Sequence, residues 1–103
     1  MEKWINCTDG FIEQDIIRFH ENVWSKPKSK RVKPQIIGER TVVASVTEIL
    51  DQEKFTHITV LSCEGDEALA KDTETKRLYK NIIKGNVHRL LWSDETARDS
   101  IKG

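Results

Sequence analysis

The sequence predicts a mainly β fold, either a small, partly open barrel or a strongly bent antiparallel sheet of about five strands, with a short C-terminal helix. Three observations favour it. Apolar and polar residues alternate over residues 41–50, a β-branched run covers residues 55–63, and a charge-ordered segment closes the chain at residues 93–103. Alternation is typical of strands that bury one face, so we expect these strands to share one sheet.

Length and composition limit the possible classes of protein. The chain has 103 residues, of which 37% are hydrophobic and 33% charged, with 17 Lys and Arg balancing 17 Asp and Glu. We expect one domain, residues 1–103, with a single core. No apolar stretch reaches the length of a membrane span, and the N-terminus lacks the apolar segment of a secretory signal. A cytoplasmic protein with no membrane partner is therefore expected.

Residues 11–24 fit two periodicities. On a helix, four apolar side chains would lie on one narrow face: Ile12, Ile16, Phe19 and Val23. On a strand, Ile17, Phe19 and Val23 share one face, and residues 13–15 can form a turn. We favour the strand because the other predicted strands need partners for their edges. The alternative is an α+β fold with a helix at residues 11–24.

The clearest strand signal lies in residues 35–50. Branched and small apolar residues occupy positions of one parity: Val42, Ala44, Val46 and Leu50. Gly38 would mark a bulge or bend near the start of this strand. Residues 51–54 favour a turn, and residues 55–63 form a second run, so the two strands are expected to pair as an antiparallel hairpin.

The remaining third of the chain is less regular. Residues 64–74 hold five acidic side chains and are expected to form a solvated loop. Apolar residues return over residues 76–92 and are interrupted by Gly85–Asn86, which indicates two short strands or one strand and an extended return. Ser93 is the predicted N-cap of the final helix, with acids in the first turn and bases in the last.

Two basic segments are candidate contacts for nucleic acid. Residues 26–33 carry five positive charges and no acid directly after Trp24, and residues 76–89 carry five more. Each phosphate neutralised by Lys or Arg releases a counterion, and an aromatic ring can stack on an unpaired base. The sequence therefore predicts weak nucleic-acid binding through these side chains: Trp24, Lys26, Lys28, Lys30, Arg31, Lys33, Lys76, Arg77, Tyr79, Lys80, Lys84 and Arg89.

The same charges fit a second function. Lysines in a hairpin loop keep the loop solvated and prevent it from pairing with other sheet edges. The three tryptophans of the chain, Trp4, Trp24 and Trp92, fit packing in the core or at its rim as well as contact with a partner. The alternative is therefore a protein-interaction or structural accessory domain with no nucleic-acid role.

Neither an enzyme nor a metal or cofactor site is expected. Cys7 and Cys63 are far apart and have no CxxC spacing, which argues against a disulfide framework and a zinc site. None of the histidines, His20, His57 and His88, has a spacing that would make it the base of a nucleophilic cysteine. Phosphate-binding loops and zinc-protease or hydrolase motifs do not occur. We predict a binding module with no catalytic residue.

Overall fold

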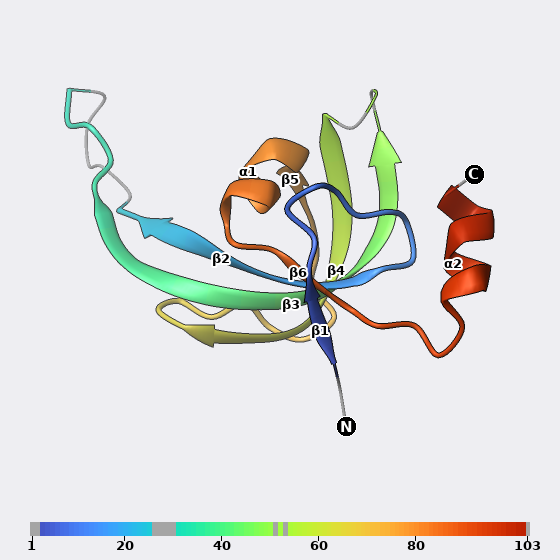
Figure 1. Ribbon diagram of the computed structural model, residues 1–103. Coiled ribbons are helices and arrows are strands. Elements are labelled where there is room, and N and C mark those ends of the chain that lie inside the picture. The colour runs from blue at the N-terminus through green and yellow to red at the C-terminus, as the bar shows by residue number, and fades with distance from the viewer. Residues whose placement is uncertain (1–2, 26–30, 51, 53, 103) are drawn as a thin grey trace.

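One open antiparallel sheet forms the body of the protein (Figure 1). The computed structural model describes residues 3–25, 31–50, 52 and 54–102. Within these residues there are six strands and two helices, in the chain order β1 (Trp4–Asn6), β2 (Ile16–Trp24), β3 (Ile36–Leu50), β4 (Phe55–Gly65), β5 (Glu74–Leu78), α1 (Tyr79–Lys84), β6 (His88–Leu90) and α2 (Glu95–Lys102). The sheet order is β1-β6-β2-β3-β4-β5. Neither helix in the described part of the chain is long and apolar enough to cross a membrane.

The mainly β class, the antiparallel pairing and the C-terminal helix are confirmed. Of the two predicted architectures, the partly open barrel is wrong and an antiparallel sheet is found, with six described strands instead of about five. β1 and β5 are the two edges of the sheet, and the sheet does not close into a barrel. Its concave side is instead covered by α1 and by the segment that connects β1 to β2 (Figure 1). Because Ile82 and Phe11 from these segments complete the core, the sheet buries its apolar side without closing on itself.

Residues 16–24 form a strand, so the alternative helix at residues 11–24 is wrong. A turn at residues 13–14, where Gln14 has a φ of 75°, precedes β2 and agrees with the predicted turn. Ile17 and Phe19 are fully buried at alternate positions. β2 pairs with β3 on one side and partly with β6 on the other, and this pairing outweighs the helical periodicity.

The predicted hairpin is confirmed as β3 and β4, which pair from Leu50 opposite Phe55 to Arg40 opposite Gly65. Its ladder contains two register shifts. The second shift lies just after Val46, and beyond it the alternate residues of β3 no longer point into the core. Leu50 is therefore only half-buried and lies outside the core, contrary to the prediction. The bulge expected near Gly38 is present where β2 pairs with β3, because Trp24 lies opposite Ile36 and one residue of β3 is unpaired.

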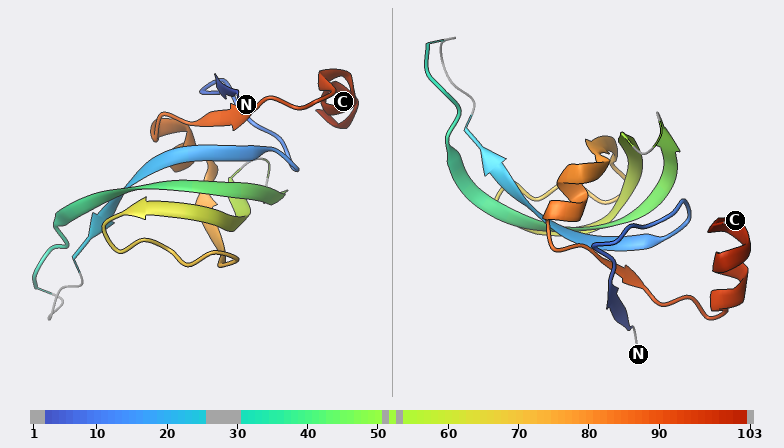
Figure 2. Two further views of the ribbon diagram at one scale, coloured as in Figure 1. Left: turned by 90° about the horizontal axis from the view of Figure 1, so that it is seen from below. Right: turned by 45° about the horizontal axis from the view of Figure 1, so that its top comes forward.

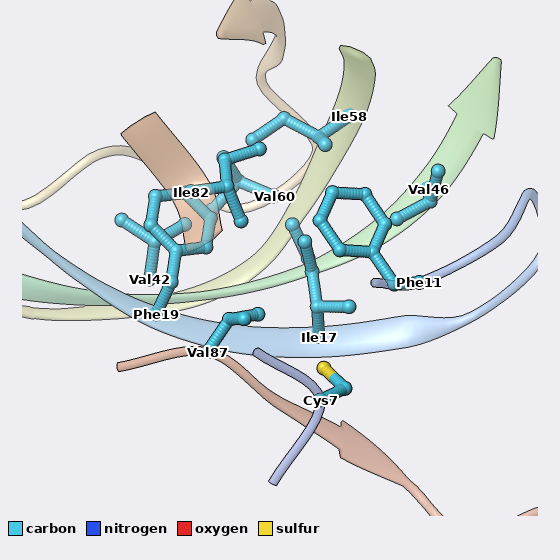
Figure 3. Packing of buried hydrophobic residues seen from close by; sticks show 11 residues of the cluster. Cys7, Phe11, Ile17, Phe19, Val42, Val46, Ile58, Val60, Ile82 and Val87 are labelled. Carbon is cyan, nitrogen blue, oxygen red and sulfur yellow. The ribbon is translucent and has the colours of Figure 1, made fainter. Parts of the chain in front are cut away.

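The core lies on the concave side of the sheet, where side chains of β2, β3 and β4 point toward α1 (Figure 3). It consists of these buried residues: Cys7, Phe11, Ile17, Phe19, Val42, Ala44, Val46, Ile58, Val60, Ile82 and Val87. Val46 is 1% exposed, as its parity predicts, whereas the adjacent Thr47 is exposed.

Two local predictions in the last third of the chain are wrong. Residues 76–92, expected to form two short strands or one strand and an extended return, contain α1 between β5 and β6. This helix has six residues, includes the β-branched pair Ile82–Ile83 and has no side-chain cap, so its sequence carries few helix signals. The cap of α2 is Asp94 rather than Ser93, because the Asp94 carboxylate accepts hydrogen bonds from the backbone N–H groups of Thr96 and Ala97.

A buried ion pair attaches α2 to the body of the protein. The Asp15 side chain is 0% exposed, and its two oxygens accept hydrogen bonds from Arg98 Nε at 2.9 Å and Nη2 at 2.8 Å. Trp92 Nε1 donates to the same carboxylate at 2.8 Å, and the backbone N–H of Ile12 at 2.9 Å. This cluster therefore joins the turn before β2 to the C-terminal helix.

The distal part of the β2–β3 hairpin extends away from the body, at the end of the molecule opposite to α2 (Figure 2). We call it the arm and define it as residues 22–24 of β2 and 36–39 of β3. β4 pairs with β3 only as far as Arg40, so the arm extends beyond the last pair of that ladder. Trp24, Ile36 and Ile37 are each more than half exposed on it.

Candidate functional site

A groove of about 670 Å³ lies between β2 and α1 and extends to residues of β3 and β5. β6 pairs with β2 only at Ile17 and Arg18. The backbone N–H of His20 donates to the carbonyl of Gly85 at 2.8 Å, directly after α1. Beyond His20, none of the strands described pairs with the edge of β2 that faces β6, and the groove opens there toward the arm. Its lining comes from β2, β3, β5, α1 and the turn after α1: Phe19, His20, Glu21, Asn22, Trp24, Glu39, Arg40, Arg77, Asn81, Ile82, Lys84, Gly85 and Asn86.

Gly85 allows α1 to approach β2 closely. A Cβ atom at this position would overlap the backbone carbonyl oxygen of His20. Since a backbone atom cannot move aside as a side-chain end can, any larger residue would push the end of α1 away from the strand. The floor of the groove thus depends on a glycine that the sequence shows only as part of a turn signal.

Three charged side chains form an ion-pair cluster on the groove wall. Glu21 and Arg40 lie directly opposite each other on β2 and β3, and Arg40 Nε donates to Glu21 Oε2 at 2.7 Å. Arg77 of β5 donates to the same carboxylate through Nε at 2.8 Å and Nη2 at 3.1 Å. β5 lies three strands from β2 in the sheet, so the curvature of the sheet brings Arg77 to Glu21 (Figure 2).

The cluster keeps an excess of positive charge. Burial by itself would raise the pKa of Glu21, but the hydrogen bonds from Arg77 and Arg40 outweigh burial and hold that pKa below its ordinary value. Glu21 is therefore ionised at neutral pH and balances one of the two guanidinium charges. The lining also includes Lys84 and Glu39, so the groove carries one net positive charge when His20 is neutral.

Uncommitted polar groups and an aromatic ring also line the groove. The side-chain amides of Asn22 and Asn81 make no hydrogen bond within the described part of the chain. Trp24 is 54% exposed at the arm end of the groove. An amide can both donate and accept hydrogen bonds, and an exposed indole offers a flat apolar surface, so the groove can contact a planar, polar ligand.

The structure brings some of the predicted contact residues to this groove and its surroundings. Trp24, Arg77 and Lys84 line it. Arg31 and Lys33 are exposed on the segment that leads into β3, and Lys80 is exposed on α1 without lining the groove. Three of the predicted contact residues lie outside the described residues: Lys26, Lys28 and Lys30.

Other predicted contact residues lie elsewhere. Lys76 is on the opposite side of β5 from Arg77, with its ammonium 5.1 Å from the ring centroid of Phe55. Tyr79 stacks on Phe11 at 4.5 Å between centroids, and its hydroxyl accepts a hydrogen bond from the Phe11 backbone N–H at 3.0 Å. Arg89 pairs with Glu95 at 2.7 Å. The basic segment 76–89 is thus divided between separate surfaces.

Sequence reasoning missed most of the groove lining, including four residues that could contact a ligand: Glu21, Asn22, Arg40 and Asn81. Glu21 and Arg40 are strand residues of opposite charge, and a cross-strand pair is the signal that could have found them. That signal requires the register between β2 and β3, which the long loop between the strands does not reveal. Asn81 could not be found because α1 was not predicted.

The described residues hold no cluster suited to a metal ion, and the Cys7 thiol is not activated. No group of three His, Cys, Asp or Glu side chains among them could hold a metal ion. Both cysteines are free, and burial, reinforced by the Asp15 carboxylate, raises the pKa of the Cys7 thiol to about 11. This thiol stays protonated at neutral pH and is a poor nucleophile. Comparisons with protein-family models, curated proteins and solved structures gave no match.

Proposed function

We propose that this chain is a small nucleic-acid-binding module that contacts its ligand through the arm and the adjoining groove. The observation that carries the proposal is the position of Trp24, which is 54% exposed at a groove lined by Arg40, Arg77 and Lys84. The basic segment 26–33 follows Trp24 directly in the sequence. Positive charge beside an exposed aromatic ring is the combination with which proteins bind nucleic acid strands.

The distribution of charge across the arm supports this proposal, although the whole chain has a formal net charge of zero. Positive charge exceeds negative charge in the groove, where Arg40, Arg77 and Lys84 outnumber Glu21 and Glu39. The acidic residues 64–74 begin at the β4 edge of β3, where the backbone N–H of Asp66 donates to the Glu39 carbonyl. A polyanion would therefore be attracted to the groove more strongly than to the acidic residues.

The test is a fluorescence anisotropy titration with short single- and double-stranded oligonucleotides at low salt. We expect micromolar or weaker binding in physiological salt, because a small surface reaches few phosphates. The triple variant Lys28→Ala, Lys30→Ala and Arg31→Ala should bind every sequence more weakly. Its salt dependence should be flatter by roughly one unit of slope for each phosphate that the variant no longer neutralises.

The matched control is a triple variant with the same change in net charge at exposed lysines away from the groove: Lys3, Lys71 and Lys76 to Ala. It should bind as the wild-type protein does. An unchanged anisotropy with every oligonucleotide at low salt would overturn the proposal. Equal weakening by both triple variants would show that net charge, rather than this surface, determines binding.

The second candidate function is a protein-interaction module, which the exposed apolar residues of the arm favour. Ile36 and Ile37 are 54% and 57% exposed on adjacent positions of β3. Neighbouring exposed apolar side chains are typical of contact surfaces. This function predicts no salt-dependent response to DNA or RNA. It also predicts a protein partner whose retention survives the triple change in segment 26–33 but is abolished in Ile36→Ser/Ile37→Ser.

A further inference from the structure

We infer that the groove beside β2 takes an unpaired nucleotide of a single strand, with the base on Trp24 and the phosphate beside Arg40 and Arg77. This inference rests on the proposed function and specifies the form of its ligand. It places one base and one phosphate at named residues of the groove, whereas the proposed function requires only that some nucleic acid bind at the arm and the groove.

The shape of the groove favours a single strand over a duplex. A volume of about 670 Å³ is within the range of pockets that hold small organic ligands. The groove lies between a strand edge and a helix, so a base must leave its stack to enter it. A duplex keeps its bases stacked and paired, whereas a single strand can turn one base outward at little cost.

The polar groups of the groove suit the two parts of a nucleotide. The uncommitted amides of Asn22 and Asn81 can hydrogen-bond the edge of a base, which presents both donors and acceptors. Arg40 donates through Nε to Glu21 and through Nη1 to the carbonyl of Glu67, and its Nη2 donates to none of the described residues. That nitrogen can donate a hydrogen bond to a phosphate oxygen, and the excess positive charge of the cluster attracts the phosphate.

Trp24 supplies the stacking surface. It lies at the arm end of the groove and is more than half exposed. Stacking of a base on an aromatic side chain typically strengthens binding by about five- to a hundredfold. The ring is exposed, so Trp24→Ala should keep its fold and report on binding alone.

The experiment compares two single-stranded oligonucleotides of the same length and phosphate number, one with bases and one abasic at every position. Both are titrated by fluorescence anisotropy at the same salt concentration, with the matching duplex as a third probe. Each probe is titrated with the wild-type chain and with three single variants, Trp24→Ala, Asn81→Ala and Ile37→Ala. Ile37→Ala is the matched control, because Ile37 is an exposed apolar residue of the arm that does not line the groove.

The wild-type chain should bind the base-bearing strand about tenfold more tightly than the abasic strand or the duplex. Trp24→Ala should remove most of this preference, Asn81→Ala should reduce it, and Ile37→Ala should keep it. Equal binding of base-bearing and abasic strands by the wild-type chain would overturn the inference while the proposed function stands. Binding the duplex as tightly as the single strand would also overturn it. Failure to bind any of the three probes would overturn both.

Discussion

Asp15 and Glu21 are both held by arginine, yet the two carboxylates belong to different kinds of cluster. Asp15 is fully buried and accepts hydrogen bonds from Arg98, Trp92 and the Ile12 backbone, so its charge is balanced by a single guanidinium. Glu21 is 17% exposed and is shared by two guanidinium groups beside an open groove. The first cluster is neutral and closed, whereas the second keeps a positive charge next to solvent.

The difference separates an ion pair that holds the fold together from one that can also act on a ligand. α2 leaves Ile101 45% exposed, and the ion pairs of Arg98 and Arg89 attach it to the body. A buried ion pair of this kind matters for stability mainly because removing one partner leaves an unpaired charge inside the protein. The Glu21 cluster can instead exchange part of its hydrogen bonding with an incoming anion.

The largest effect is expected when the closed cluster is broken. Asp15→Ala leaves Arg98, whose side chain is 8% exposed, without its partner and removes the acceptor of Trp92 Nε1. The free energy of unfolding should fall by about 3–5 kcal/mol, measured by urea denaturation. The control is Glu95→Gln, which weakens the more exposed ion pair with Arg89. It should lower the free energy of unfolding much less than Asp15→Ala does. Equal losses for the two variants would contradict the conclusion that burial makes the Asp15 cluster the more important ion pair for stability.

A smaller loss of stability, together with a gain in binding, is expected for the open cluster. Glu21→Gln keeps the side-chain shape but removes the charge that balances Arg40 and Arg77, so unfolding should become easier by about 1–2 kcal/mol. Affinity for a short single strand at low salt should rise by roughly three- to tenfold, because the groove gains one unit of positive charge. Glu64→Gln makes the same charge change at an exposed position outside the groove lining and should leave both quantities nearly unchanged. Weaker binding by Glu21→Gln would show that the two arginines do not contact the ligand.

The smallest effect is the contribution of Glu21 to the dependence of stability on pH. Because its pKa is lowered on folding, the unfolded chain binds more protons just below the ordinary pKa of 4.5, and stability rises with pH there. The contribution of Glu21 is fully present above that pH and is lost as pH falls through the lower pKa of the folded state. Urea midpoints measured between about pH 3 and 6 should therefore rise less steeply in Glu21→Gln than in the wild-type chain. Identical slopes would mean that Glu21 has the same pKa in the folded and unfolded states.

Parts of the candidate site could be predicted from sequence, and each omission has a physical cause. Trp24, Arg77 and Lys84 were found because aromatic and basic residues are visible as residue types. Arg89 and Tyr79 were predicted as contacts on the same grounds but pack within the protein, on Glu95 and Phe11. Residue type shows which interactions a side chain can make, whereas the fold determines the partner that it meets.

The sequence by itself determined strands β3 and β4, because alternation over residues 41–50 and 55–63 is a local property that follows from the pleat of a strand. It also determined the C-terminal helix and the free state of both thiols. Only the tertiary structure decided that the sheet stays open and that Arg77, three strands from β2, reaches Glu21. Register, curvature and the approach of Gly85 to His20 depend on contacts between segments far apart in the chain, and a single sequence does not display those contacts.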